Sequence, residues 1–152
     1  MFNFKNNYME FALKEAELAS MRGEVPIGAV IVNSLTNEII TTSSNEVEKL
    51  QDPTAHAELL AIKKACSLLG SKFINYCDLY VTLEPCPMCA HAISLARIRR
   101  LYFGAYDIKG GGVQHGARVF SSNSCHHTPE IYEGIEALKS ETLLKNFFQK
   151  LR

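Results

Sequence analysis

Two short segments of the chain carry side chains that together suit one metal ion. The first is His56-Ala57-Glu58, and the second is Pro85-Cys86-Pro87-Met88-Cys89. Cysteines at positions i and i+3 lie on one side of a helical turn, so both sulfurs can reach the same ion. With His56 they supply three protein ligands, the number typical of catalytic zinc, whereas structural zinc usually takes four. We therefore expect one zinc ion per chain, and a fold that brings the two segments together.

Glu58 is the carboxylate that remains beside these three ligands. One neutral imidazole and two thiolates leave zinc a usable Lewis acid, which can activate water near neutral pH. Glu58 is then expected to act as a general acid and base that carries protons. Each residue also has an ordinary interpretation: Cys86 and Cys89 as a structural zinc or redox pair, and Glu58 as a charge favoured by a helix dipole. The joint pattern argues against these interpretations.

Length and charge limit the fold and the partners. A chain of 152 residues is expected to form a single domain, residues 1–152, that buries roughly two-thirds of its unfolded surface. A formal net charge of zero argues against a strongly basic, non-specific nucleic-acid binder, but not against a local basic patch. Such a patch is predicted from four residues after the cysteine motif: Arg97, Arg99, Arg100 and Lys109.

Cysteine usage and the N-terminus indicate the compartment. The chain has five cysteines, an odd number with one C-x-x-C pair, which indicates a metal or redox site in a reducing compartment. Residues 1–20 mix charged and apolar side chains, and no stretch of 18 apolar residues occurs. We expect a cytoplasmic protein with no membrane segment.

Hydrophobic periodicity predicts an α/β fold. Helices are expected over 8–21, about 55–69 with Asp52 or Thr54 as N-cap, 86–96 and 135–151. Strands are expected over 27–32, 38–42, 77–83 and 101–105, the first two forming a hairpin. Gly110 to Gly112 mark a mobile or sharply turned loop, and residues 113–128 show no regular pattern. The alternation of strands and helices after the hairpin predicts an α/β sandwich around a mixed sheet.

The order H-x-E followed by P-C-x-x-C is the known signature of zinc nucleobase deaminases. Over nearly its whole length the chain resembles the bacterial tRNA-specific adenosine deaminases, which have a cytidine deaminase-like fold. The matching segments are 24–30, 52–58, 80–86, 88–90, 103–105, 133–135 and 146–148. The loop 110–128 departs from the family pattern, which leaves its contacts to flanking nucleotides undefined.

The resemblance implies a three-layer α/β/α fold with a central mixed sheet, and hydrolytic conversion of adenosine to inosine at the wobble position of a tRNA anticodon. It further implies a homodimer that binds the anticodon stem-loop, with Asn45 touching the target nucleotide and Asp107 lining the RNA groove. Taken without the resemblance, Asn45 reads as a turn residue and Asp107 as part of a loop. Of Phe147 and Phe148, one is expected in the core and the other as a base-stacking surface.

Two other functions remain open from the sequence. One is deamination of a free purine or pyrimidine, as in guanine or cytosine deaminases, which share the motif. The other is a non-catalytic, zinc-stabilised module that binds RNA, although such a module has no use for Glu58 beside an open zinc position.

Overall fold

The computed structural model describes residues 7–152, so the first six residues of the N-terminal segment considered above lie outside it. Within this range no helix is long and apolar enough to cross a membrane. The elements, in chain order, are α1 (Tyr8–Met21), β1 (Gly28–Asn33), β2 (Glu38–Ser44), α2 (Val47–Leu50), α3 (Ala57–Leu69), β3 (Cys77–Leu83), α4 (Pro87–Leu95), β4 (Arg100–Ala105), the 3-10 turn η2 (Val119–Ser121), β5 (Glu130–Tyr132) and α5 (Ala137–Lys150).

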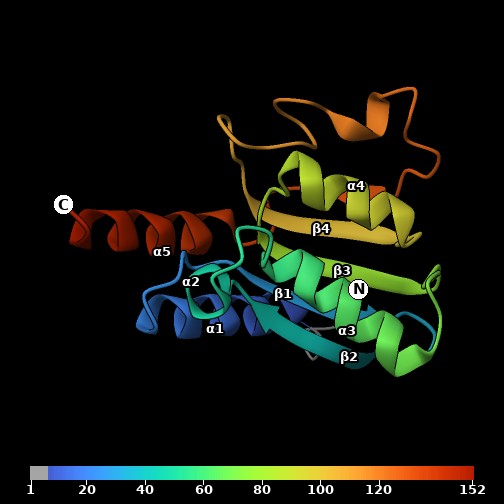
Figure 1. The fold of residues 1–152 in the computed structure, drawn as a ribbon, viewed down its shortest axis with the longest axis horizontal. Helices are drawn as coiled ribbons and strands as arrows, with labels where there is room; N and C mark the ends of the chain where they lie inside the picture. The colour runs from blue at the N-terminus through green and yellow to red at the C-terminus, as the bar shows by residue number, and fades with distance from the viewer. Residues whose placement is uncertain (1–6) are drawn as a thin grey trace.

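A five-stranded mixed sheet lies at the centre, in the order β2-β1-β3-β4-β5 (Figure 1). Strand β1 runs antiparallel to both β2 and β3, whereas β3, β4 and β5 run parallel to one another. The carboxyl ends of β3 and β4 therefore meet at one edge of the sheet. The cysteine motif follows β3 and the loop beginning at Tyr106 follows β4, so the two segments leave this edge side by side.

Alternate residues of the central strands fill two separate cores, one on each face of the sheet. Ile31, Leu79 and Phe103 pack toward α3 and α4 in the larger core. Val30 and Val32 point to the opposite face, against α1, and α5 packs beside α1 on that face. The sheet is thus covered by helices on both sides, as Figure 1 shows for α3 and α4 in front of it. The predicted three-layer α/β/α fold is confirmed.

The elements that the sequence missed are the shortest. α1 and β3 have the predicted bounds, and α4 and α5 are shorter than predicted by one or two residues at each end. By contrast, α2 has four residues and β5 has three, which is too short for either periodicity to appear in the sequence. The short β5 nevertheless completes the sheet, because it pairs with β4 over Arg100 to Tyr102.

Candidate metal centre and active site

The two helices of the metal motif each begin next to a predicted ligand. His56 is the N-cap of α3 and Cys86 is the N-cap of α4, and both have extended backbone angles. The predicted start of α3, with Asp52 or Thr54 as N-cap, is wrong. The amide and the hydroxyl of Thr54 both donate to Oδ1 of Asp52, at 2.8 and 2.7 Å, and close a tight turn before the helix. An Asp in such a turn has the same sequence signature as an N-cap.

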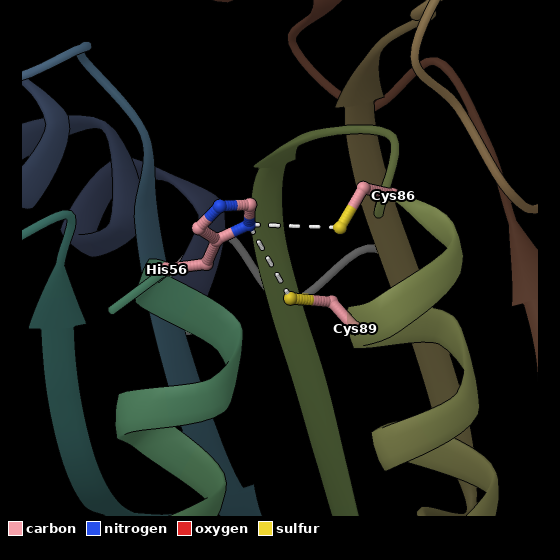
Figure 2. Close-up of side chains that lie close together, drawn as sticks. All are labelled: His56, Cys86 and Cys89. Atoms are coloured by element: carbon pink, nitrogen blue, oxygen red, sulfur yellow. Dashed lines mark hydrogen bonds between the residues drawn. The ribbon is translucent and has the colours of Figure 1, made fainter. Parts of the chain in front are cut away.

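The three predicted ligands converge (Figure 2). Nδ1 of His56 lies 3.5 Å from Sγ of Cys86 and 3.7 Å from Sγ of Cys89. Tetrahedral zinc with ordinary Zn–N and Zn–S bond lengths places nitrogen and sulfur roughly 3.6 Å apart. All three donor atoms lie within 4.8 Å of one another. The donor set and its spacing therefore fit one zinc ion held by Nδ1 of His56 and the two sulfurs.

The charge of the cluster also suits a cation. A hydrogen bond from Cys89 lowers the pKa of Cys86 to about 4, against burial and with help from His56, so this sulfur is a thiolate at neutral pH. The same hydrogen bond, together with burial, raises the pKa of Cys89. Without metal, the two sulfurs thus share one proton and one negative charge. Zinc that binds both sulfurs has to displace that proton, so binding releases it to solvent.

Glu58 lies in the first turn of α3 and is 3% exposed. Burial raises its pKa to about 7; its own backbone amide opposes this shift, and the neighbouring Cys86 adds to it. The charge of His56 and a hydrogen bond from Cys89 lower its pKa and so oppose part of the shift. A carboxyl group with this pKa can both take up and release a proton near neutral pH, as a proton carrier must.

A groove of about 1110 Å³ opens beside His56. Asn45 and Asp107, the two predicted substrate contacts, both line it. Glu24, Glu48, Tyr106 and Lys109 contribute polar lining, and α5 supplies an apolar wall of Leu144, Phe147 and Phe148, with Leu151 just beyond the helix. As expected from the sequence, Phe147 is buried, at 8% exposure, and Phe148 is open, at 46%.

Asn45 and Asp107 each have a structural contact as well. Oδ1 of Asn45 accepts the Ala57 amide at 2.9 Å, which ties the start of α3 to the end of β2. Among the described residues none accepts a hydrogen bond from Nδ2 of Asn45, so this donor is available to a molecule bound in the groove. Oδ1 of Asp107 accepts the Gly110 amide at 2.9 Å, which leaves Oδ2 for other contacts.

Sequence reasoning missed two buried glutamates, Glu24, which lines the groove, and Glu84, which precedes the cysteine motif. Glu24 accepts the amides of Glu48 and Lys49, at 3.0 and 2.9 Å, and so fixes α2 at the groove wall. Glu84 accepts amides of the loop that follows β4. For Glu84 the available signal was a charged residue between a buried strand and Pro85, because a carboxylate is seldom buried unless it is paired or hydrogen-bonded.

Each arginine of the predicted basic patch has another contact. Arg99 makes a two-pronged pair with Asp78, at 2.8 and 2.7 Å, and Arg100 pairs with Glu130 at 2.7 Å. The Arg97 guanidinium lies over a phenylalanine ring. Only Lys109 of the four lines the groove.

Comparisons with known proteins agree with this geometry. Residues 3–105 match the family model of the cytidine and deoxycytidylate deaminase zinc-binding region. The tRNA-specific adenosine deaminase of Agrobacterium fabrum is 51% identical over 148 residues, which cover 97% of this chain and 96% of that protein. A solved structure from work on A-to-I editing by tRNA:A34 deaminases at the wobble position of transfer RNA is 52% identical, with a TM-score of 0.87, over 90% of this chain and 98% of that one. The guanine deaminase structure from Bacillus subtilis is 39% identical, with a TM-score of 0.63, over 70% of this chain and 66% of that one.

Proposed function

Because this chain belongs to the family of tRNA-specific adenosine deaminases, we propose that it converts adenosine to inosine at the wobble position of a tRNA anticodon. The reaction is a zinc-dependent hydrolysis: water adds at C6 of the purine, and the exocyclic amine leaves as ammonia. One domain, residues 1–152, carries the site.

The observation that carries this proposal is the position of the metal cluster at a large, open groove. At about 1110 Å³ the groove is above the usual range for a pocket that encloses one small molecule. Its rim exposes the aromatic rings of Tyr106 and Phe148, at 41% and 46%. Exposed aromatic rings stack on unpaired bases, which is how proteins hold single-stranded RNA loops. The groove therefore fits a base together with its neighbours in an anticodon loop.

The residues of the cluster divide the chemistry between them. His56, Cys86 and Cys89 hold the zinc ion, which supplies the Lewis acidity that makes water nucleophilic near neutral pH. Glu58 accepts one proton from the attacking water and passes it to the ring nitrogen N1. It then takes the remaining proton from the new C6 hydroxyl and delivers it to the amine, which leaves as ammonia. Asn45 donates from Nδ2 to the target nucleotide, and Asp107 and Lys109, which also line the groove, contact the neighbouring nucleotides.

The assembly and location follow from the same family membership. We propose that two chains form a homodimer in the cytoplasm, with the anticodon stem-loop as the substrate. Sedimentation of the purified protein at micromolar concentration tests the dimer directly: a mass of twice 17.0 kDa is expected, and a monomer would reject it.

Product analysis separates this function from deamination of a free base. Zinc-loaded protein is incubated with an anticodon stem-loop bearing a wobble adenosine, and in parallel with guanine, cytosine and cytidine. We expect inosine at the wobble position and no product from the other three. Turnover of a free base with an untouched stem-loop would overturn the assignment while leaving the zinc chemistry in place.

A further inference from the structure

Glu84, between β3 and the cysteine motif, is a second buried carboxylate, and the mechanism above does not use it. It is 2% exposed and accepts five hydrogen bonds from one loop. The backbone amides of Asp107, Val113, Gln114 and His115 donate to it at 3.1, 3.2, 2.9 and 3.0 Å. The His115 ring completes the set, with Nδ1 at 2.8 Å from Oε1 of Glu84.

This carboxylate is an anion that the loop encloses. Its two oxygens accept four backbone amides and the His115 ring, an arrangement of hydrogen-bond donors alone that suits the charged carboxylate. All the other groups that contact Glu84 are N–H donors, so Nδ1 of His115 carries the hydrogen in this contact. Hydrogen bonds to a charged acceptor are stronger than neutral ones, and a buried carboxylate that loses them has no water to replace them.

The loop is shaped closely around this contact. A Cβ added to Gly111 would lie 2.5 Å from Oε2 of Glu84, so only glycine allows the chain to pass there. Val113 packs into the main core, and the segment that follows crosses over α4, as the orange trace in Figure 1 shows. From the sequence, the run Gly110 to Gly112 was expected to be mobile or sharply turned. It is sharply turned, and its contacts with Glu84 hold it in place.

His115 also contacts the groove wall. Its ring meets the ring of Tyr106 edge to face, with centroids 5.6 Å apart, and Tyr106 in turn meets the buried Phe103 in the same way. Asp107, which donates its amide to Glu84, is two residues before Lys109, and all three of Tyr106, Asp107 and Lys109 line the groove. The Glu84–His115 contact thus supports the part of the groove wall formed by Tyr106, Asp107 and Lys109.

We propose that Glu84 and His115 are positioning residues, which hold the loop 106–115 in the shape that the RNA substrate requires. This inference rests on the proposed function, since the groove wall matters only if RNA binds there. It also gives a role to the stretch that departs from the family pattern. His115, within that stretch, donates a hydrogen bond to the carboxylate of Glu84, which directly precedes the cysteine motif. His115 is not a ligand, because among residues 7–152 only His56, Cys86 and Cys89 form a metal-binding cluster.

The test compares His115→Ala with His115→Asn, whose side-chain amide can replace the Nδ1 donor. The exposed His126 lies outside the loop, so His126→Ala is the matched control. Three quantities are measured: bound zinc, amide hydrogen exchange at residues 113–115, and steady-state kinetics on the stem-loop.

For His115→Ala we expect full zinc and a kcat near that of the unsubstituted protein. Exchange of the loop amides should be about tenfold faster or more, the factor for one lost hydrogen bond to a charged group. KM should rise by a similar factor. His115→Asn should recover most of both changes, and His126→Ala should show neither.

Glu84→Gln provides a second route if His115→Ala folds poorly. It places an amide donor against the loop N–H groups, so it should speed the same exchange, and adding His115→Ala to it should cause little further change. Unchanged exchange and KM in His115→Ala, or fully additive effects in the double variant, would overturn the proposal. These results are distinct from a failure of the proposed function, in which the unsubstituted protein itself leaves the stem-loop unmodified.

Discussion

Gly112 is the point at which the loop after β4 touches the metal helix, and Gly112→Ala tests that contact. Its amide donates to the Pro85 carbonyl at 2.8 Å. An added Cβ would lie 2.6 and 2.7 Å from N and Cα of Pro87, and 2.9 Å from the carbonyl carbon of Cys86. These are backbone atoms at the start of α4, so no side-chain rotation can relieve the contact. The loop or the Cys86 end of the helix has to move.

The cost can be worked out from overpacking in other cores. An extra methyl group without room destabilises by about 1–3 kcal/mol. For a chain of this length that lowers Tm by about 2–12 °C. If about 1.4 kcal/mol of the strain is relieved when the metal leaves, zinc binds roughly tenfold more weakly. Thermal unfolding of the zinc-free protein and competition against a coloured chelator measure the two effects.

Gly110→Ala is the matched control, two residues away in the same glycine run. Its Cβ would meet only side-chain atoms of Asp107, the nearest at 3.0 Å, and these can move. We expect a change within about 0.5 kcal/mol and unaltered zinc affinity. Equal Tm and equal zinc affinity in the two variants would refute the tight packing of this loop against the metal helix.

Three further outcomes follow from contacts in and around the groove. Asn45→Ala should lower the free energy of unfolding by about 1 kcal/mol and raise KM. Asn45→Asp keeps the oxygen that accepts the Ala57 amide, so it should raise KM alone. Equal unfolding curves for the two variants would show that Asn45 does not stabilise the start of α3. Lys109→Ala should raise KM and reduce the salt dependence of RNA binding by roughly one charge, while Arg99→Ala should destabilise the fold without affecting that dependence. In zinc-free protein at pH 6, iodoacetamide should alkylate Cys86, whose pKa of about 4 keeps it a thiolate, and spare Cys77, whose burial raises its pKa to about 11. Mass spectrometry identifies the alkylated cysteines. Alkylation of Cys77 should increase only as the pH approaches 11. Preferential alkylation of Cys77 at pH 6 would contradict the assignment of Cys86 as the thiolate.

The sequence predicted the parts of the molecule that follow from short-range chemistry. The spacing of Cys86 and Cys89 and the order of the two motifs predicted a three-ligand cluster, and the three donor atoms lie where one zinc ion can reach them. The buried strands and the longer helices follow from periodicity, since each buries a face over many residues.

What the sequence could not predict depends on contacts between distant segments. The start of α3 was placed too early because Asp52 caps a turn instead of a helix, and both uses look alike in sequence. The ion pairs of the basic patch could not be predicted for a similar reason: Asp78 and Glu130, which pair with Arg99 and Arg100, lie 21 and 30 residues away in the chain. Glu84 is adjacent to the motif, but its role appears only when the loop that it holds folds back over it.

The measurement that tests the account most directly is inosine formation by Glu58→Gln, with bound zinc determined on the same sample. Gln has nearly the shape of Glu but cannot carry the proton, so the cluster should keep one zinc per chain. Turnover on the stem-loop should fall by about 10²–10⁴-fold or more, the usual contribution of a general acid–base group. Turnover near that of the unsubstituted protein, with zinc still bound, would contradict the central role assigned to Glu58.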